Sequence, residues 1–324
     1  MQQGNPTSLR VPDPGVADLL AQDARWQAWL DVEAALAKAE AELQMIPGPA
    51  AEEIVRKCDL SLFDRARLTE GFQRTGHSLV PLIWELSRLC DGDAGNYVHW
   101  GATTQNITQT GDLLQLRKVH RVFLRQIGAI LAALADLAER SKDMALPGRT
   151  HGQHAVPATY GLKAAVWIDE FARNVERLEQ SEPRVFQAML GGAAGTVASF
   201  GDRGLEVQAR MAAHLEMPPM AVPARNIMDH LAEHIMALAL LAASCGKFAN
   251  EIYTGMKQEF GEVEEPFTAG TVGSSTMPQK RNPFISQDIM AYTAQIRTMV
   301  PLALEAVMTE HEANRQTSLM MRQA

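Results

Sequence analysis

The chain has 324 residues, 46% of them hydrophobic and 21% charged, which is typical of a globular protein long enough to bury a large core. The net charge of −8 excludes a general nucleic-acid binder, because phosphates require a basic surface, although a few local cations can still bind a small anion. Cys58, Cys90 and Cys245 lie far apart and form no CxxC pair, which argues against a disulfide framework or zinc site and favours a reducing compartment.

The chain begins with a polar segment, residues 1–12, that lacks the basic and then apolar pattern of a signal peptide. The longest apolar stretch, residues 236–243, is too short to cross a bilayer. We therefore expect a soluble cytoplasmic protein that binds neither a membrane nor nucleic acid.

Long helices dominate the pattern that follows. Residues 26–45 carry one apolar stripe at three- and four-residue spacing, and Pro47 and Pro49 end it. Residues 107–145 contain no proline, and their apolar side chains repeat every seven residues, as in the helices of long bundles. The heptad positions are Leu116, Phe123, Ile130 and Leu137, with Val119, Ile127 and Leu134 on neighbouring positions.

Further helices are predicted over residues 160–180, 227–260 and 284–319, the last interrupted only near Pro301. No segment shows the sustained alternation of a strand. We therefore predict an all-α fold, a bundle of long helices. An N-terminal helical domain is expected over residues 1–105 and a central bundle domain over residues 106–324.

The segments between these helices are rich in Gly, Thr, Ser or His, and functional side chains favour loops that a rigid scaffold holds. In the loop 261–283, glycines and hydroxyl residues precede Lys280, Arg281 and Asn282. Such a loop suits a lid that closes over an anion and excludes water. An ordinary solvated loop is the alternative.

A second loop, residues 149–157, places His151 and His154 three residues apart, beside Thr150 and Gln153. Histidine can move a proton near neutral pH. No third ligand is evident, so we predict no metal site. A capping or core histidine is the alternative.

Thr103 and Thr104 precede the helix predicted from residue 107. Either can be an N-cap, and the backbone N–H groups there can also hold a carboxylate, so the two roles are compatible. His77, beside an apolar run, fits a core residue. Gly191 and Gly192 predict a tight helix-to-helix crossing, because no GK[ST] follows them as in a phosphate-binding loop.

Residues 273–283 (GSSTMPQKRNP) resemble the signature GSSxMPxKxNP of the fumarase/aspartase superfamily, in its adenylosuccinate lyase and 3-carboxy-cis,cis-muconate cycloisomerase branch. Residues 29–47, 98–104, 149–157 and 191–198 resemble the same branch, in the same order. The resemblance implies a helical homotetramer whose active sites each combine loops from three subunits. It implies a reaction that needs no metal or organic cofactor.

Members of this family take a proton from the carbon beside a carboxylate, form an aci-carboxylate carbanion and expel a group from the neighbouring carbon, usually leaving fumarate. By resemblance, Ser274 is the base, His151 is the general acid or its relay, and His77 is the second histidine of the site. The matching substrate-binding positions are Thr103, Thr104, Thr150, Gln153, Ser275, Lys280 and Asn282.

The chain departs from the branch pattern at several positions. Gln287 stands where a glutamate usually supports the catalytic histidine. Met228 replaces the arginine of an Arg-Asp pair, with Arg225 and Asn226 nearby, and Ala313 replaces the arginine of a Glu-His-Glu-Arg run. These departures argue against adenylosuccinate itself. The small helical domain that usually follows the bundle is not found, which suggests a truncated chain.

We therefore predict a homotetrameric lyase that cleaves a C–N bond in a succinyl-type polycarboxylate and releases fumarate. The first alternative is a cycloisomerase that forms or opens a lactone by the same carbanion chemistry. The second is a non-catalytic helical scaffold, which Gln287 and Met228 favour and which Ser274, Lys280 and His151 oppose.

Overall fold

The computed structural model describes residues 11–267, 270 and 272–324, and most of them form helices, as predicted. Three residues of the predicted loop 262–283, at positions 268, 269 and 271, lie outside the described part. The elements are α2 (Val16–Leu19), α3 (Gln22–Glu42), α4 (Gly48–Lys57), η1 (Leu60–Leu62), α5 (Arg65–Thr75), α6 (Val80–Leu89), η2 (Ala94–Tyr97), α7 (Thr104–Arg140), β1 (Ala145–Thr150), β2 (Gln153–Thr159), α8 (Tyr160–Val185), η3 (Ala198–Arg203), α9 (Gly204–His214), α10 (Asp229–Gly255), α11 (Phe284–Glu305) and α12 (Arg315–Gln323).

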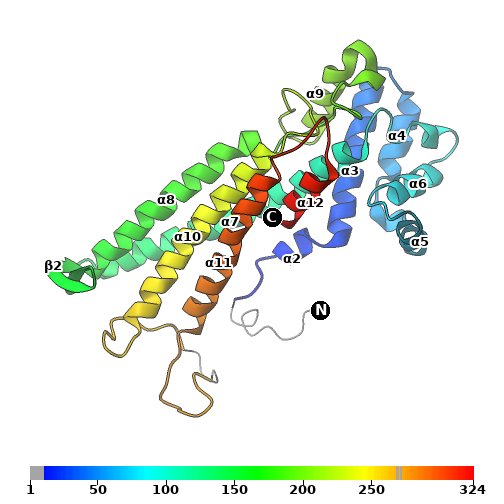
Figure 1. Cartoon of the computed structure of the whole chain (residues 1–324). Helices are drawn as coiled ribbons and strands as arrows, with labels where there is room; N and C mark the ends of the chain where they lie inside the picture. The colour runs from blue at the N-terminus through cyan, green and yellow to red at the C-terminus, as the bar shows by residue number, and fades with distance from the viewer. Residues whose placement is uncertain (1–10, 268–269, 271) are drawn as a thin grey trace.

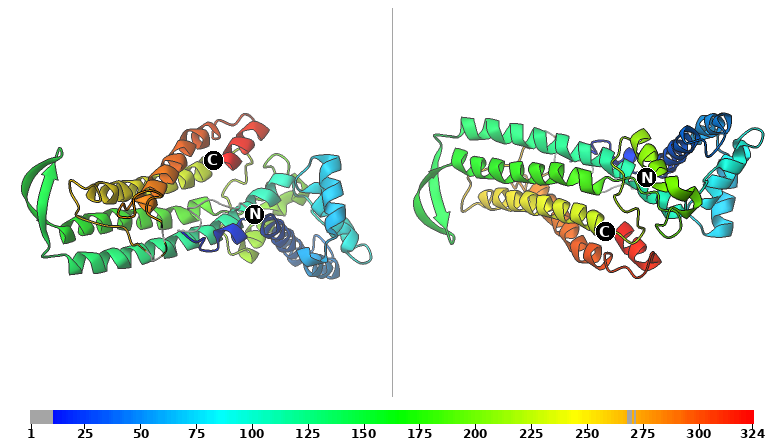
Figure 2. Two further views of the ribbon diagram at one scale, coloured as in Figure 1. Left: turned by 90° about the horizontal axis from the view of Figure 1, so that it is seen from below. Right: turned by 90° about the horizontal axis from the view of Figure 1, so that it is seen from above.

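The molecule is elongated, with α7, α8, α10 and α11 running along its length (Figure 1). Helices α3 to α6 gather with α9 at one end, and the hairpin of β1 and β2 lies at the other end (Figure 2). Figure 1 shows that α10 runs toward the hairpin end and α11 returns from it. The loop between α10 and α11 therefore lies far from the N-terminal helices.

The long helix predicted from residue 107 is confirmed as α7, which has 37 residues. Val119, Ile127 and Leu134 are buried against the rest of the chain. The side chains at the heptad positions are more exposed than these three, and Ile130 is 38% exposed. Leu116, Phe123 and Leu137 are half-buried, so one copy of the chain covers the seven-residue stripe only in part.

Two predicted boundaries are wrong. Pro301 lies inside α11 and does not interrupt it; the helix ends at Glu305, and α12 begins only at Arg315. Pro301 lies near the end of α11, where a missing N–H removes only one of the last backbone hydrogen bonds. Residues 146–157 belong to an antiparallel β-hairpin, although the sequence predicts a loop.

The core at the N-terminal end includes side chains from distant parts of the chain. Trp29, Leu30 and Leu36 of α3 belong to the same buried cluster as Val207 and Met211 of α9. The α9 side chains lie in the second of the two predicted domains. The boundary at residue 105 stays a prediction.

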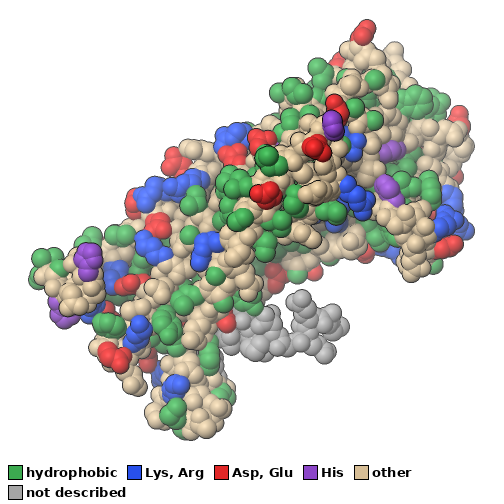
Figure 3. Space-filling model, in the orientation of Figure 1, with side chains coloured by type: hydrophobic (Ala, Val, Ile, Leu, Met, Phe, Trp, Pro, Cys, Tyr) green, Lys and Arg blue, Asp and Glu red, His purple; other side chains and the backbone are tan. Residues whose placement is uncertain are grey.

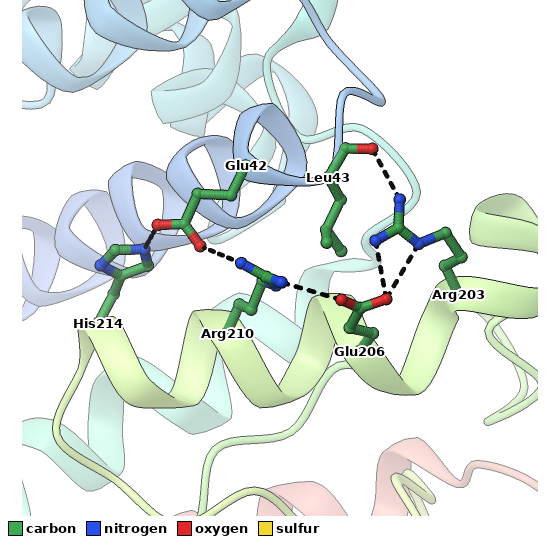
Figure 4. A network of polar contacts seen from close by, with 6 residues as sticks. All are labelled: Glu42, Leu43, Arg203, Glu206, Arg210 and His214. Carbon is green, nitrogen blue, oxygen red and sulfur yellow. Dashed lines mark hydrogen bonds and ion pairs between the residues drawn. The ribbon is translucent and has the colours of Figure 1, made fainter.

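Ion pairs join the exposed sides of α3 and α9 (Figure 4). Glu42 accepts hydrogen bonds from Arg210 at 3.0 Å and from His214 at 2.8 Å. Arg203 and Arg210 also share Glu206. Exposed pairs of this kind contribute little, about 0–1 kcal/mol each, so apolar packing is the main contact between the two helices.

By length and composition, α10 is apolar enough to cross a membrane, with a mean hydropathy of 1.4 over an 18-residue window. The expectation that no segment is long enough is therefore wrong for this helix. Only 22% of that window is buried within the chain. A helix that is apolar on several sides either spans a membrane or packs inside a larger assembly.

Glu40 of α3 is fully buried, and neither of its carboxylate oxygens has a hydrogen-bond partner. Burial, and to a smaller extent the charge of Glu33, raises the pKa of Glu40 to about 9. The side chain is therefore protonated in the folded protein at neutral pH, whereas it ionises near its ordinary value when the chain unfolds.

We expect this carboxyl group to make the protein less stable as the pH rises. The contribution of protonated Glu40 to the free energy of unfolding is fully present below pH 4.5, the ordinary pKa of the group. It is lost progressively as the pH rises toward the folded-state pKa of about 9, at up to about 1.4 kcal/mol per pH unit. In Glu40→Gln this pH dependence disappears, so the variant gains stability relative to the native protein between pH 5 and pH 8. Urea unfolding at both pH values measures the difference; parallel losses in the two proteins would contradict the prediction.

Candidate active site

Two neighbouring residues, Thr103 and Thr104, form the N-terminus of α7. Thr103 is the N-cap, and its backbone N–H donates to Asn106 Oδ1 at 3.0 Å. Thr104 is the first residue of the helix and is half-buried. One threonine thus caps α7, and the other stands where the helix N-terminus favours an anion.

His77 lies in the connection between α5 and α6 and reaches this helix end. Its Nδ1 accepts hydrogen bonds from the backbone of Leu79 at 3.2 Å and of Val80 at 3.1 Å. Its Nε2 lies 3.5 Å from Thr104 Oγ1. Because Nδ1 accepts, neutral His77 carries its proton on Nε2, where it can be donated to Thr104 or to a bound molecule. The side chain is only half-buried, unlike a core histidine.

The glycine loop after α8 completes this group. Gly192 N–H donates to Asn106 Oδ1 at 3.1 Å, so one buried amide oxygen holds both the loop and the start of α7. At Gly191, a Cβ atom would lie 2.0 Å from the carbonyl oxygen of Pro223. The predicted helix-to-helix crossing is therefore wrong: the glycine allows two loops to approach closely. We call His77, Thr103, Thr104, Asn106 and Gly192 the α7 cluster.

The predicted Thr-His segment forms the tip of the β-hairpin, at the opposite end of α7. Thr150 pairs with Gln153 across a two-residue turn of His151 and Gly152, both with positive φ. This is a favoured hairpin geometry. Thr150, His151 and Gln153 are exposed, and Figure 3 shows histidines on the surface there. The turn projects these side chains away from their own chain.

The third group lies in residues 262–283, which we call the serine loop. Ser274 Oγ accepts hydrogen bonds from the backbone N–H groups of Thr276 at 3.4 Å and of Met277 at 3.2 Å. Asn282 Nδ2 donates to the carbonyl oxygen of Gly273 at 2.9 Å. The loop therefore folds back on itself and places Asn282 and the preceding Lys280 beside Ser274.

Lys280 and Ser275 are exposed on this loop. Within the described part of the chain, Lys280 Nζ has no carboxylate partner, whereas Arg281 pairs with Glu264 at 2.9 Å. An exposed ammonium group without such a partner, in the same loop as a hydroxyl group that accepts two N–H groups, favours an anion there. The hydrogen bonds to Ser274 Oγ also favour its deprotonated form.

Glu265 is a structural residue of this loop that the sequence pattern did not reveal. Its carboxylate accepts hydrogen bonds from Ile285 N at 3.0 Å, Ser286 N at 2.7 Å and Ser286 Oγ at 2.6 Å. It thereby caps the start of α11 and holds the end of the serine loop there. Gln287, which stands where the family has a glutamate, is exposed in the same turn.

The predicted site residues thus fall into three separate groups. His77, Thr103 and Thr104 lie together; Thr150 and Gln153 flank His151; and Ser274, Ser275, Lys280 and Asn282 share the serine loop. The 37 residues of α7 extend about 55 Å at 1.5 Å per residue, and they separate the first group from the second. Arg149 pairs with Glu262 at 2.6 Å and connects the hairpin to the serine loop.

The family described as lyase matches residues 10–297 of the chain. The chain is 41% identical over 290 residues to N-acetyl-S-(2-succino)cysteine lyase of Enterococcus italicus, covering 90% of the chain and 64% of that protein. It is 40% identical to the adenylosuccinate lyase of Methanothermobacter thermautotrophicus, covering 95% and 69% respectively. The chain thus spans about two thirds of the length of these relatives.

Solved structures show the same relationship. The 3-carboxy-cis,cis-muconate lactonizing enzyme from Pseudomonas putida superposes with a TM-score of 0.88 at 32% identity, over 96% of this chain and 69% of that one. Fumarate lyase from Mesorhizobium sp. BNC1 gives 0.87 at 35% identity, over 95% and 69%. The chain therefore belongs to the lyase family of the fumarase/aspartase superfamily, among relatives that include adenylosuccinate lyases and carboxymuconate cycloisomerases.

Proposed function

We propose that the assembled protein is a lyase that eliminates an amine or thiol from a succinyl-type polycarboxylate and releases fumarate. The observation that carries this proposal is the geometry of the serine loop, in which Asn282 and the backbone of Lys280 lie against Gly273, the neighbour of Ser274. Ser274 takes a proton from the carbon next to a carboxylate. Lys280 and Asn282 neutralise the additional negative charge of the carbanion, and fixed charge of this kind is usually the largest catalytic contribution.

The electron pair of the broken C–H bond then forms the double bond of fumarate, and the bond to the leaving nitrogen or sulfur breaks. The departing atom takes a proton from a general acid, for which we propose His151, directly or through His77. The α7 cluster binds one substrate carboxylate at Thr103 and Thr104, assisted by the helix N-terminus. Thr150, Gln153 and Ser275 contact the same substrate from the other loops.

A homotetramer in which loops from different subunits form each site would bring the three groups of residues together. The heptad stripe of α7, which one chain covers only in part, supports this assembly. So do the exposed apolar side chains of α10 and α11, which lie among polar groups on the face in Figure 3. Such a surface needs partner helices. The exposed apolar side chains on these two helices include Met236, Leu240, Ile296 and Leu304.

The substrate we favour is smaller than a nucleotide. Met228 stands where the branch carries an arginine, and it is buried. An apolar side chain at this position offers no charge to a phosphate. The similarity to a lyase named for a succinylated cysteine supports a leaving group of amino-acid size.

Fumarate absorbance measured with N-succinyl and S-succinyl substrates tests the proposal, with adenylosuccinate and carboxymuconate as comparisons. We expect fumarate release from a small succinyl amine or thioether. Consumption of carboxymuconate alone would establish the cycloisomerase, which the similarity to the P. putida enzyme favours. An intact oligomer that converts none of them would contradict the proposed substrates and favour the scaffold.

A further inference from the structure

Arg225 lies in the connection before α10, and two residues beside the α7 cluster hold it in place. Its Nε donates to Gln105 Oε1 at 3.1 Å, and Gln105 Nε2 donates to the Arg225 carbonyl oxygen at 2.8 Å. Its Nη1 donates to the carbonyl oxygen of Ala193 at 2.6 Å. Gln105 follows Thr104, and Ala193 follows Gly192. The guanidinium is therefore fixed at the border of the α7 cluster.

The bonding of Arg225 differs from that of most arginines in the described chain. Arg203 and Arg210 pair with Glu206 and Glu42, as Figure 4 shows. Arg225 has no carboxylate partner among the described residues, and its Nη2 donates to none of them. Burial lowers the pKa of its guanidinium, and no described carboxylate opposes that effect. The half-buried guanidinium of Arg225 thus keeps N–H groups that can donate to a ligand.

The surroundings of Arg225 favour an anionic ligand. Asn226 donates to the carbonyl oxygen of His311, so the segment that carries Glu310 and Glu312 passes nearby, yet neither carboxylate pairs with Arg225. The N-terminus of α7, whose residue Gln105 bonds to Arg225, adds positive potential near the guanidinium. The fork of a guanidinium fits a carboxylate through two parallel hydrogen bonds, and locking the fork in advance reduces the entropy lost on binding.

We propose that Arg225 is a specificity-determining residue that binds a carboxylate of the leaving group, and that Gln105 is its positioning residue. This inference rests on the proposed function, in which Thr103 and Thr104 bind one carboxylate of the succinyl half and Lys280 and Asn282 bind the other. Arg225 then faces a third anionic group. The substrates are therefore succinyl thioethers or amines whose leaving group carries its own carboxylate, as in an N-acylated amino acid.

Two thioethers that differ by one group test this inference in the assembled protein. They are N-acetyl-S-(2-succinyl)cysteine and N-acetyl-S-(2-succinyl)cysteamine, which lacks only the carboxylate of the leaving group. Calorimetry in a Ser274→Ala background measures the two dissociation constants without turnover. We expect the carboxylate to tighten binding about 10- to 100-fold, as a charge-assisted hydrogen-bonded pair does.

In Arg225→Met this preference should disappear, with the affinity for the cysteamine thioether unchanged. Arg225→Lys keeps the charge without the fork and should retain part of the preference, and Gln105→Leu should weaken it. Arg117→Met is the matched control. Arg117 also donates to two oxygen atoms, the carbonyl oxygens of Leu215 and Glu216, but it lies on α7 13 residues after Thr104. That variant should keep the full preference.

Equal losses for both thioethers in Arg225→Met would overturn the inference, as would a wild-type protein without any preference. Fumarate release by the wild-type protein tests the proposed function separately. If the binding preference depends on Arg225 but the wild-type protein releases no fumarate, the proposed reaction is contradicted and the carboxylate site is supported. Binding of neither thioether would overturn both.

Discussion

Replacing Ser274 by alanine is expected to lower kcat for fumarate release by about 10²- to 10⁴-fold, the usual contribution of a positioned acid or base. Two backbone N–H groups donate to Ser274 Oγ and would stabilise the negative charge that this oxygen carries before it accepts a proton from carbon. Lys280 and Asn282 remain in the variant, so the substrate should still bind and KM should change much less than kcat.

The oligomer size and the melting temperature should stay the same, because Ser274 is half-buried in a loop and, among the described residues, its hydroxyl group hydrogen-bonds only to neighbouring backbone groups. Steady-state kinetics and size-exclusion chromatography measure both properties. Ser61→Ala is the matched control: it removes an exposed serine hydroxyl group in the N-terminal helices and should keep the native rate. A native kcat in Ser274→Ala would remove the serine from the mechanism.

Two inactive variants are expected to restore activity when their subunits are mixed. Ser274 lies beyond the end of α10, whose 27 residues extend about 40 Å, whereas His77 lies near the start of that helix, beside α7. The two residues cannot meet within one chain, so a site that contains both takes them from different subunits. Ser274→Ala and His77→Asn subunits would then form some sites in which both residues are native.

Random mixing of equal amounts should return up to about a quarter of the native activity, because each native residue is present with a probability of one half. The mixing requires reversible dissociation, and co-purification through a tag on one variant shows that hybrids have formed. Each variant alone, taken through the same treatment, is the control. Hybrids that form and stay inactive would contradict the shared site and with it the proposed tetramer.

The order and type of the long helices could be predicted from the sequence, because the apolar pattern of a helix is local. The pattern predicts a helix over residues 107–145, and α7 covers Thr104–Arg140, so the prediction begins three residues late and ends five residues late. The hairpin escaped prediction because its strands are short and contain Pro147 and Pro157, and because its turn depends on positive φ at His151. Strand pairing is a contact between segments, which periodicity along one segment does not report.

The candidate site residues come from the sequence and stay predictions. Ser274, Lys280 and Asn282 lie within nine residues, and a loop that folds back on itself brings such neighbours together. The partners of Asn106 and Arg225 were not visible, because Gly192 lies 86 residues from Asn106 and Gln105 lies 120 residues from Arg225. Only the packing of the helices decides which loops share an end of the bundle.

The sequence by itself determined that this protein is built of long helices and that it resembles a family of lyases, and it predicted candidate reactive residues on the loops between the helices. The tertiary structure alone decided that α7 holds two of those loops at opposite ends, that Arg225 is fixed without a carboxylate partner among the described residues, and that the buried Glu40 carboxyl group has no hydrogen-bond partner there. The physical reason is that helix formation and loop composition depend on neighbours along the chain. Separation, burial and charge pairing depend on residues that only the folded chain brings together.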